Sequence, residues 1–377
     1  MATVQTSVLV GDAKKQLDDL LLQVCEELQL TQTRYDLAVS RYEAANRLLE
    51  AKNSPFREFR PRIYPQGSMA LGTTNKPVDG PHDLDFVLQL DAPHWQWKPL
   101  ALMLVLYEFF KSNDKYRDMA TLKNRVVRLT YADDFYMDIL PAYTDVLSGG
   151  TCILVPDREL VALCHSNPEG YISWFRNRAL SRRRLLLEKA KPVPPQQEAI
   201  EKEPLQLSVQ LLKRWRDLAF ESEELAPISI VLTTLAGMHY CGEESASEAL
   251  STILAGIVSS IDRADLNGQR IEVRNPGNQL EDFGERWDAR PAAYSAFKQG
   301  IRRLQRDWAA IVNGRRDTNK ELERLFGEYV RTVLVKQAQR LQEARKAGQL
   351  AVTSTGLITG LSSGLTRIPQ NTFHGDG

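Results

Sequence analysis

The chain has 377 residues, of which 43% are hydrophobic and 25% charged, and its 48 Lys and Arg balance 48 Asp and Glu. This length can bury a sizeable core and favours two lobes over one domain. The neutral balance argues against a protein whose whole surface attracts nucleic acid. Four scattered cysteines with few histidines make no zinc pattern, and the longest apolar run, 100–106, is too short for a bilayer. We expect a cytoplasmic protein with reduced cysteines, no signal peptide and no membrane contact.

The first half of the chain predicts a helical start followed by a sheet. Residues 11–52 carry apolar side chains at helical spacing, which indicates one long helix or a broken pair. A buried helix is predicted at 99–112. Strands that this helix covers are predicted at 62–66, 83–90, 125–131 and 135–140, the last two joined by a turn at 132–134.

The second half is predicted to be helical. Prolines near residue 192 interrupt a basic helix and indicate the lobe boundary. Helices are then predicted at 197–220, 227–240, 245–262, 287–313 and 318–347. The segment from Gly348 is rich in Ser, Thr and Gly and is expected to be flexible. The predicted parts of this α+β protein are an N-terminal helical spine (1–60), a catalytic sheet lobe (61–192), a helical lobe (196–347) and a C-terminal tail (348–377).

The strand predicted at 83–90 carries two carboxylates on one face. Asp83 and Asp85 lie two residues apart, so their side chains project together while Leu84 faces a core. Like charges side by side repel, so we expect a cation there, and Mg²⁺ prefers carboxylate oxygens. The turn at Gly67 and Ser68 offers backbone N–H groups and a hydroxyl to a triphosphate. A metal beside a phosphate cradle indicates nucleotidyl transfer.

A third carboxylate, Asp138, lies in the strand-like run FYMDILPAY. Two-metal phosphoryl transfer uses one ion to activate the acceptor hydroxyl and another to neutralise the leaving pyrophosphate. Asp83 and Asp85 would bridge both ions, and Asp138 would bind the first and accept the hydroxyl proton. The alternative is that Asp83 caps a loop and Asp138 is an edge-strand charge. The order of Gly-Ser turn, Asp-x-Asp pair and later strand Asp favours catalysis.

The motifs together resemble the CD-NTases, the cyclic-oligonucleotide synthases of bacterial anti-phage signalling (CBASS), which are relatives of cyclic GMP-AMP synthase and oligoadenylate synthetase. The matching segments are QGSMALGT (66–73), HDLDFVLQL (82–90), MDILPA (137–142), LVPDRE (154–159), SNPEGYISWF (166–175), LLKRWRD (211–217) and VRNPGNQLEDFGERW (273–287). The first two define only the wider polymerase-β-like superfamily, and LVPDRE, SNPEGYISWF and LLKRWRD narrow it to the bacterial branch. One departure is the spacing of fourteen residues between Ser68 and Asp83, slightly longer than the superfamily pattern.

The resemblance implies a polymerase-β-like nucleotidyltransferase sheet lobe and an oligoadenylate-synthetase-like helical lobe. It also implies two Mg²⁺ ions, with Mn²⁺ as an alternative, held by Asp83, Asp85 and Asp138. Lys213 in LLKRWRD would contact the triphosphate, although a solvated helix face explains it too. Ser229 resembles the family's second phosphate-contacting serine, and an ordinary N-cap or first-turn serine is the alternative.

The implied function is synthesis of a cyclic di- or trinucleotide second messenger from NTPs, ATP and/or GTP, for a separate effector. Two other classes stay open: a template-independent nucleotidyltransferase acting on an RNA end or small molecule, and a non-catalytic module with the same fold. The basic segment 176–192 lacks interleaved aromatics, and the zinc insertion of the animal relatives has no counterpart, so no DNA activator is expected.

The chain ends in NTFHGDG, with Gly377 last. Some CD-NTases are conjugated through their C-terminal residue by an E1/E2-like enzyme. A terminal glycine permits the close backbone approach that such an enzyme needs. The resemblance therefore implies a conjugating partner for Gly377, and a terminus without function is the alternative.

Overall fold

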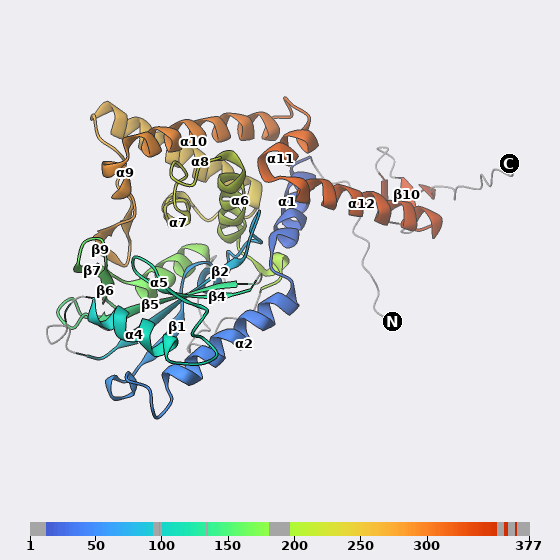
Figure 1. The fold of residues 1–377 in the computed structure, drawn as a ribbon. Helices are drawn as coiled ribbons and strands as arrows, with labels where there is room; N and C mark the ends of the chain where they lie inside the picture. Colours follow the sequence, from blue (N-terminus) through green and yellow to red (C-terminus); the bar gives the residue numbers. More distant parts are fainter. Residues whose placement is uncertain are drawn as a thin grey trace.

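The computed structural model describes residues 13–92, 98, 100–132, 135–180, 197–352, 358–360 and 366–367. A seven-stranded mixed sheet forms one lobe, and a group of helices forms the other, placed across from the sheet in Figure 1. The predicted α+β class is confirmed. None of the described helices is long and apolar enough to cross a bilayer.

The sheet is built around a parallel pair of strands. Its order is β1-β2-β5-β4-β3, with β6 pairing farther along β5 and β7 pairing with β6. Strands β2 and β5 run parallel, and the other neighbours are antiparallel. The strands are β1 (Arg62–Pro65), β2 (His82–Leu90), β3 (Ala120–Leu122), β4 (Val127–Tyr131), β5 (Phe135–Thr144), β6 (Ile153–Asp157) and β7 (Ala162–Ser166).

Strand β5 is longer than the sequence pattern predicts, since it continues past Pro141 to Thr144. At Pro141 the strand pairs with β2, while pairing with β4 ends at Ile139 and pairing with β6 begins at Tyr143. A proline has no backbone N–H to donate in a sheet ladder. Pro141 lies between the residues of β5 that pair with β4 and those that pair with β6, so neither of these strands needs that N–H. Strands β6 and β7 were not predicted.

Alternation along β2 divides the sheet into two faces. Leu84, Phe86 and Leu88 are buried in one core with α2 (Gln32–Leu49) and α4 (Ala101–Lys111), which cover that face. Asp83 and Asp85 therefore project from the opposite face, toward the helical lobe. The predicted division of this strand into a core face and a carboxylate face is confirmed.

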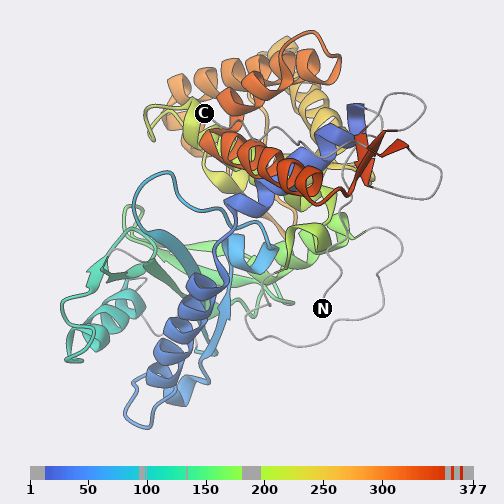
Figure 2. The same cartoon turned by 90° about the vertical axis from the view of Figure 1, so that its right-hand side faces the viewer.

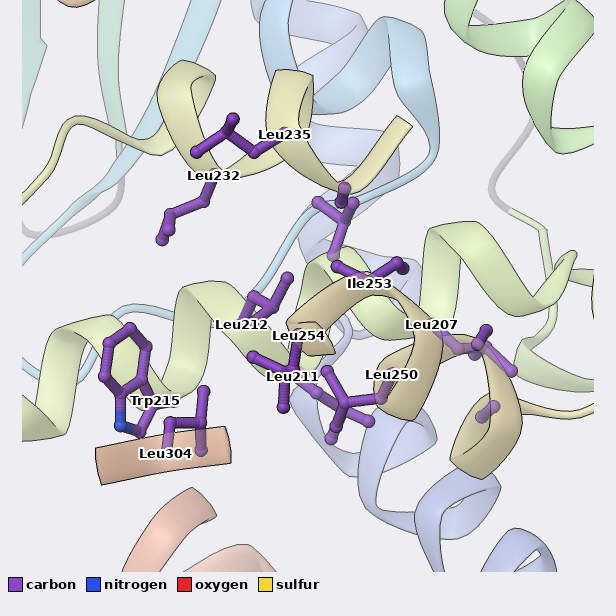
Figure 3. Packing of buried hydrophobic residues seen from close by; sticks show 14 of the residues in the cluster. Leu207, Leu211, Leu212, Trp215, Leu232, Leu235, Leu250, Ile253, Leu254 and Leu304 are labelled. Atoms are coloured by element: carbon purple, nitrogen blue, oxygen red, sulfur yellow. The ribbon is translucent and has the colours of Figure 1, made fainter. Parts of the chain in front are cut away.

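The helical lobe has its own core, in which leucines of neighbouring helices meet. Figure 3 shows Leu211 of α6 beside Leu250 and Leu254 of α8, all fully buried. The helices of this lobe are α6 (Pro204–Ala219), α7 (Ser229–His239), α8 (Ala246–Leu266), α9 (Arg286–Ala289), α10 (Pro291–Val312), α11 (Thr318–Phe326) and α12 (Glu328–Lys346). Two further elements adjoin it: α5 (Pro168–Ala179), which packs into this core, and the hairpin of β8 (Arg274–Asn275) and β9 (Asn278–Asp282), whose flanking residues Val273 and Phe283 pack there.

Backbone chemistry explains where the predicted helices differ. Helix α6 begins at Pro204 rather than 197, because Glu203 and Gln206 form a capping box around a proline that has no N–H to satisfy. The helix predicted at 287–313 is divided before Pro291. The helix predicted at 318–347 is divided at Gly327, whose φ of 84° suits glycine.

The N-terminal region is a pair of helices rather than one. Helix α1 (Ala13–Leu28) packs into the helical-lobe core, and α2 packs on the sheet, so this pair spans both lobes (Figure 2). The side chain of Thr31 caps α2 and separates the two helices.

In the predicted flexible tail the structure instead has a small sheet of β10 (Leu350–Val352), β11 (Ile358–Gly360) and β12 (Thr366–Arg367). Leu350 and Ala351 are buried, which gives this segment a reason to fold. Gly377, the turn residues 133–134 and most of the basic segment lie outside the described residues.

Candidate active site

A cleft of about 810 Å³ lies between the two lobes. Its sheet side is formed by β2, β4, β5 and the loop after β1, and its helix side by α6, the loop that follows α6, and α7. Every predicted site residue except Asp138 lines the cleft directly. The lining includes Gly67, Ser68, Asp83, Asp85, Arg128, Tyr136, Lys213, Arg216, Asp217, Phe220, Glu223, Ser229 and Thr233.

The structure brings the three predicted carboxylates onto one face of the sheet. Asp85 stands opposite Asp138 in the parallel register of β2 and β5. Asp83 stands opposite Tyr136, one step along the same face. The side chain of Asp83 is 61% exposed and that of Asp138 12% exposed, so the group runs from solvent into the sheet.

An arginine that sequence reasoning missed holds this group. The Arg128 guanidinium donates to both oxygens of Asp138 at 2.7 Å and to Asp83 at 3.4 Å. It also lies 4.3 Å above the ring of Tyr136. Among the described residues, no three acidic, His or Cys side chains form a ready-made metal-binding group. Asp138 faces Arg128 instead.

Burial and mutual repulsion change the acid strength of the aspartates on β2. Burial, followed by the charges of Asp138 and Asp83, raises the pKa of Asp85 to about 7. Burial also raises the pKa of Asp83, and Arg128 opposes this rise. A bound cation would favour the charged forms of both carboxylates.

The predicted phosphate turn is the start of the short helix α3 (Gly67–Leu71). Gly67 has φ of 59°, and a Cβ there would lie 2.6 Å from Asp85 Oδ2. A larger residue would therefore collide with the carboxylate. The backbone N–H of Gln66 donates to the carbonyl of Asp85 at 2.9 Å, which fixes the turn against β2.

On the helix side, Lys213 of α6 donates to the carbonyl of Thr73 at 3.0 Å. Burial lowers the pKa of its ammonium group, and Asp217 and Asp85 oppose this effect. Lys213 thus faces the cleft, and its position contradicts the alternative of a solvated helix face. Ser229 is the first residue of α7, with Ile228 at the N-cap, so it is a first-turn serine rather than the cap, and it lines the cleft.

The contact between Arg128 and Asp138 could have been predicted from the sequence. In a hairpin whose turn is centred on Asp133, Arg128 and Asp138 both lie five residues from the centre and face each other. The helix-side residues Phe220 and Glu223 carried no comparable signal, because their place in the cleft depends on how the lobes pack.

Comparison with known proteins identifies the family. A model of the Second Messenger Oligonucleotide or Dinucleotide Synthetase domain matches residues 16–179. The chain is 30% identical, over 98% of its length and the whole of the relative, to a c-di-GMP synthase of Roseivirga ehrenbergii. This chain belongs to the CD-NTase family. It is a nucleotidyltransferase that synthesises cyclic oligonucleotides, and the alternative of a non-catalytic module is set aside.

Further relatives of this CD-NTase support the assignment. It is 28% identical to the cyclic dinucleotide synthase CdnG of Bradyrhizobium diazoefficiens, over 90% of this chain and 88% of CdnG. The structure of that CdnG in complex with GTP has a TM-score of 0.72 and 26% identity, covering 85% of this chain and 98% of the other. The cyclic AMP-GMP synthase DncV of Vibrio cholerae shares the fold at 14% identity and a TM-score of 0.52, covering 87% and 93%.

Proposed function

We propose that this CD-NTase joins two molecules of GTP into cyclic di-GMP and releases two pyrophosphates. The observation that carries the proposal is one cleft lined by Asp83 and Asp85 on its sheet side and by Lys213 on its helix side, with Asp138 beside Asp85 on the same face of the sheet. The choice of guanine is supported by the relative named a c-di-GMP synthase and by the GTP complex of CdnG.

In each of the two steps, a ribose hydroxyl oxygen of one nucleotide bonds to the α-phosphorus of the other. The bond between the α-phosphorus and the bridging oxygen breaks, and pyrophosphate leaves with that oxygen. Asp138 would take the hydroxyl proton, since it lies on the same face as Asp85. The second step closes the ring.

The donor set on the sheet fits two Mg²⁺ ions, with Mn²⁺ as an alternative, because all three side chains offer hard carboxylate oxygens. Asp83 and Asp85 would hold both ions, and Asp138 would hold one once its oxygens turn from Arg128. Bound there, the metal ions supply a lowered hydroxyl pKa and charge neutralisation of the pyrophosphate.

The protein groups around these carboxylates would orient the nucleotides. The turn at Gly67 and Ser68 offers backbone N–H groups to the triphosphate, and Lys213 offers a mobile positive charge. Asp217 and Glu223 place carboxylate oxygens on the helix side of the cleft. Such oxygens accept hydrogen bonds from the guanine N1–H and 2-amino groups, which adenine lacks.

The product would act as a second messenger in anti-phage defence, read by a separate effector protein. The support for this role is membership of the CD-NTase family, whose function is signalling rather than RNA tailing. A cyclic dinucleotide, rather than a polymer, is the expected product because the relatives are named c-di-GMP synthase and cyclic dinucleotide synthase.

The test is synthesis from labelled nucleotides. Purified protein is incubated with GTP, with ATP or with both in Mg²⁺, and the products are treated with phosphatase and compared with a cyclic di-GMP standard. We expect a phosphatase-resistant product from GTP alone. A product that requires ATP would overturn the choice of guanine, and a phosphatase-sensitive linear product would overturn ring closure.

A further inference from the structure

A row of side chains on α6 holds the loop at 71–76 against the helical lobe. Gln206 donates to the carbonyl of Leu71 at 2.9 Å, and Gln210 donates to the carbonyl of Thr74 at 2.8 Å. Lys213 continues the row with its bond to Thr73. Residues four and then three apart lie on one helix face, so α6 presents the whole row to backbone carbonyls of this one segment.

The loop bonds back to the helix in return. The side chain of Asn75 donates to the backbone carbonyl of Gln210 at 2.8 Å. Gln210 is fully buried, and Asn75, Gln206 and Lys202 are less than 9% exposed. Buried polar groups of this kind are costly unless they are bonded, so this row favours one relative placement of loop and helix.

A buried lysine fixes the direction of the Gln210 amide. Lys202 donates its ammonium to Gln210 Oε1 at 3.1 Å. An ammonium group only donates, so the amide oxygen faces Lys202 and the amide nitrogen faces Thr74. The donor toward the loop is therefore set by a residue that does not touch the loop.

The loop is the direct continuation of the predicted phosphate turn. Helix α3 starts at Gly67 and ends at Leu71, with Gly72 as its C-cap, and the N–H of Thr73 donates to the carbonyl of Ser68 at 3.0 Å. A Cβ on Gly72 would lie 2.6 Å from the Gln206 amide nitrogen. Turn, loop and α6 thus form one packed unit, and the opposite face of α6 is buried in the core (Figure 3).

We propose that Gln206 and Gln210 are positioning residues that fix the Gly67–Ser68 turn at the distance from Lys213 that a nucleoside triphosphate requires. The two amides belong to the helical lobe and the turn belongs to the sheet lobe, so the row joins the lobes directly behind the cleft. This inference rests on the proposed function of the cleft, because the turn and Lys213 matter together only if both contact one triphosphate.

The decisive variant is Gln210→Glu, which keeps an oxygen for Lys202 and removes the donor to Thr74. Loss of one such bond corresponds to about a tenfold change in an equilibrium. We expect the Kd for a non-hydrolysable GTP analogue and the KM for GTP to rise about tenfold, with kcat changed by less than about threefold. Hydrogen exchange of the amides in 66–76 should accelerate, while exchange in β2 stays unchanged.

Two further variants make the result interpretable. Lys202→Met with Gln210→Leu removes both members of the buried pair, so it stays folded even where the single variant does not, and it should show the same rise in Kd. Ser208→Ala is the matched control, since Ser208 is also fully buried on α6 and its hydroxyl bonds to none of the described residues. The control should bind the analogue as the unaltered protein does.

The outcomes separate this inference from the proposed function. Wild-type affinity and KM in the folded double variant would overturn the positioning role and leave cyclic di-GMP synthesis intact. Faster loop exchange without weaker binding would also overturn it, because the anchoring would then be structural only. Absence of GTP-analogue binding by the unaltered protein would instead overturn the proposed function.

Discussion

The two sides of the cleft are built on different chemistry. The sheet side gathers carboxylates on neighbouring strands and places one guanidinium, that of Arg128, against Asp138 and Asp83. The helix side has two amides and one ammonium group on α6, which bond to backbone carbonyls in the segment 71–76. The sheet side holds the carboxylates proposed to bind metal, and the helix side holds the groups proposed to bind and align the nucleotide. We therefore expect substitutions on the sheet side to lower turnover and substitutions on the helix side to weaken nucleotide binding.

The largest effect should follow from removing the carboxylates of β2. We expect Asp83→Ala with Asp85→Ala to lower turnover by at least about a thousandfold, because the residues proposed to hold both metal ions are lost. The melting temperature should be unchanged or higher, since burial and repulsion raise the pKa values of both groups and make their ionisation unfavourable. Turnover with labelled GTP and thermal melting measure the two expectations.

A control for that variant lies directly after the same strand. Asp91, which follows β2 and accepts a hydrogen bond from Thr144 at 2.6 Å, is outside the cleft lining. Asp91→Asn should retain turnover. Substantial activity in the double variant would show that the sheet side is not the reacting side.

The second effect concerns Asp138 alone. Asp138→Asn should lower turnover by about a hundredfold through loss of the proton acceptor, while the Kd for a GTP analogue changes little. The amide keeps an oxygen for Arg128, so the fold of the sheet should hold. Isothermal titration beside product assays separates binding from chemistry. Weakened binding with normal turnover at saturation would contradict the role given to Asp138.

On the helix side, we expect a substitution to change KM more than kcat. Lys213→Met should raise the KM for GTP about tenfold or more and lower kcat less, because its ammonium is proposed to contact the triphosphate both before and during reaction. Steady-state kinetics over a range of GTP concentrations measure the division. A fall in kcat at unchanged KM would give Lys213 a role in the chemical step, as for the carboxylates, and would contradict the difference between the two sides.

The sheet side was the more predictable of the two. Strand residues alternate strictly, so Asp83 and Asp85 on one face and Leu84 in the core followed from spacing alone. The Arg128–Asp138 pair could have been predicted from the position of the turn, but it was recognised only in the structure. The long β5 was underestimated because Pro141 reads as a strand end, and tertiary pairing overrides that signal.

The helix side was less predictable for a physical reason. Gln206 and Gln210 resemble ordinary exposed glutamines in a helical pattern, since their partners are carbonyls more than a hundred residues away in the chain. Lys213 was found only through the family resemblance. Long-range bonds from side chains to loop backbone leave no local pattern, whereas a strand displays its two faces in every pair of residues.

The smallest effect concerns pH and Lys202, the buried cation of the helix side. Burial lowers the pKa of Lys202 to about 8, and its hydrogen bond goes to an uncharged amide. Between this value and the ordinary pKa of 10.5 the unfolded chain binds more protons at this position, so stability rises with pH across that window. The nearby Cys25, whose pKa burial raises to about 12, stays neutral over the same range. Relative to Lys202→Met, the free energy of unfolding of the unaltered protein should increase by about 2 kcal/mol from pH 7 to pH 9.5. Urea unfolding of both proteins at several pH values measures this difference. If the difference in free energy of unfolding between the two proteins did not change with pH, Lys202 would keep its proton in the folded protein. The helix side would then contain a buried charge, as the sheet side does.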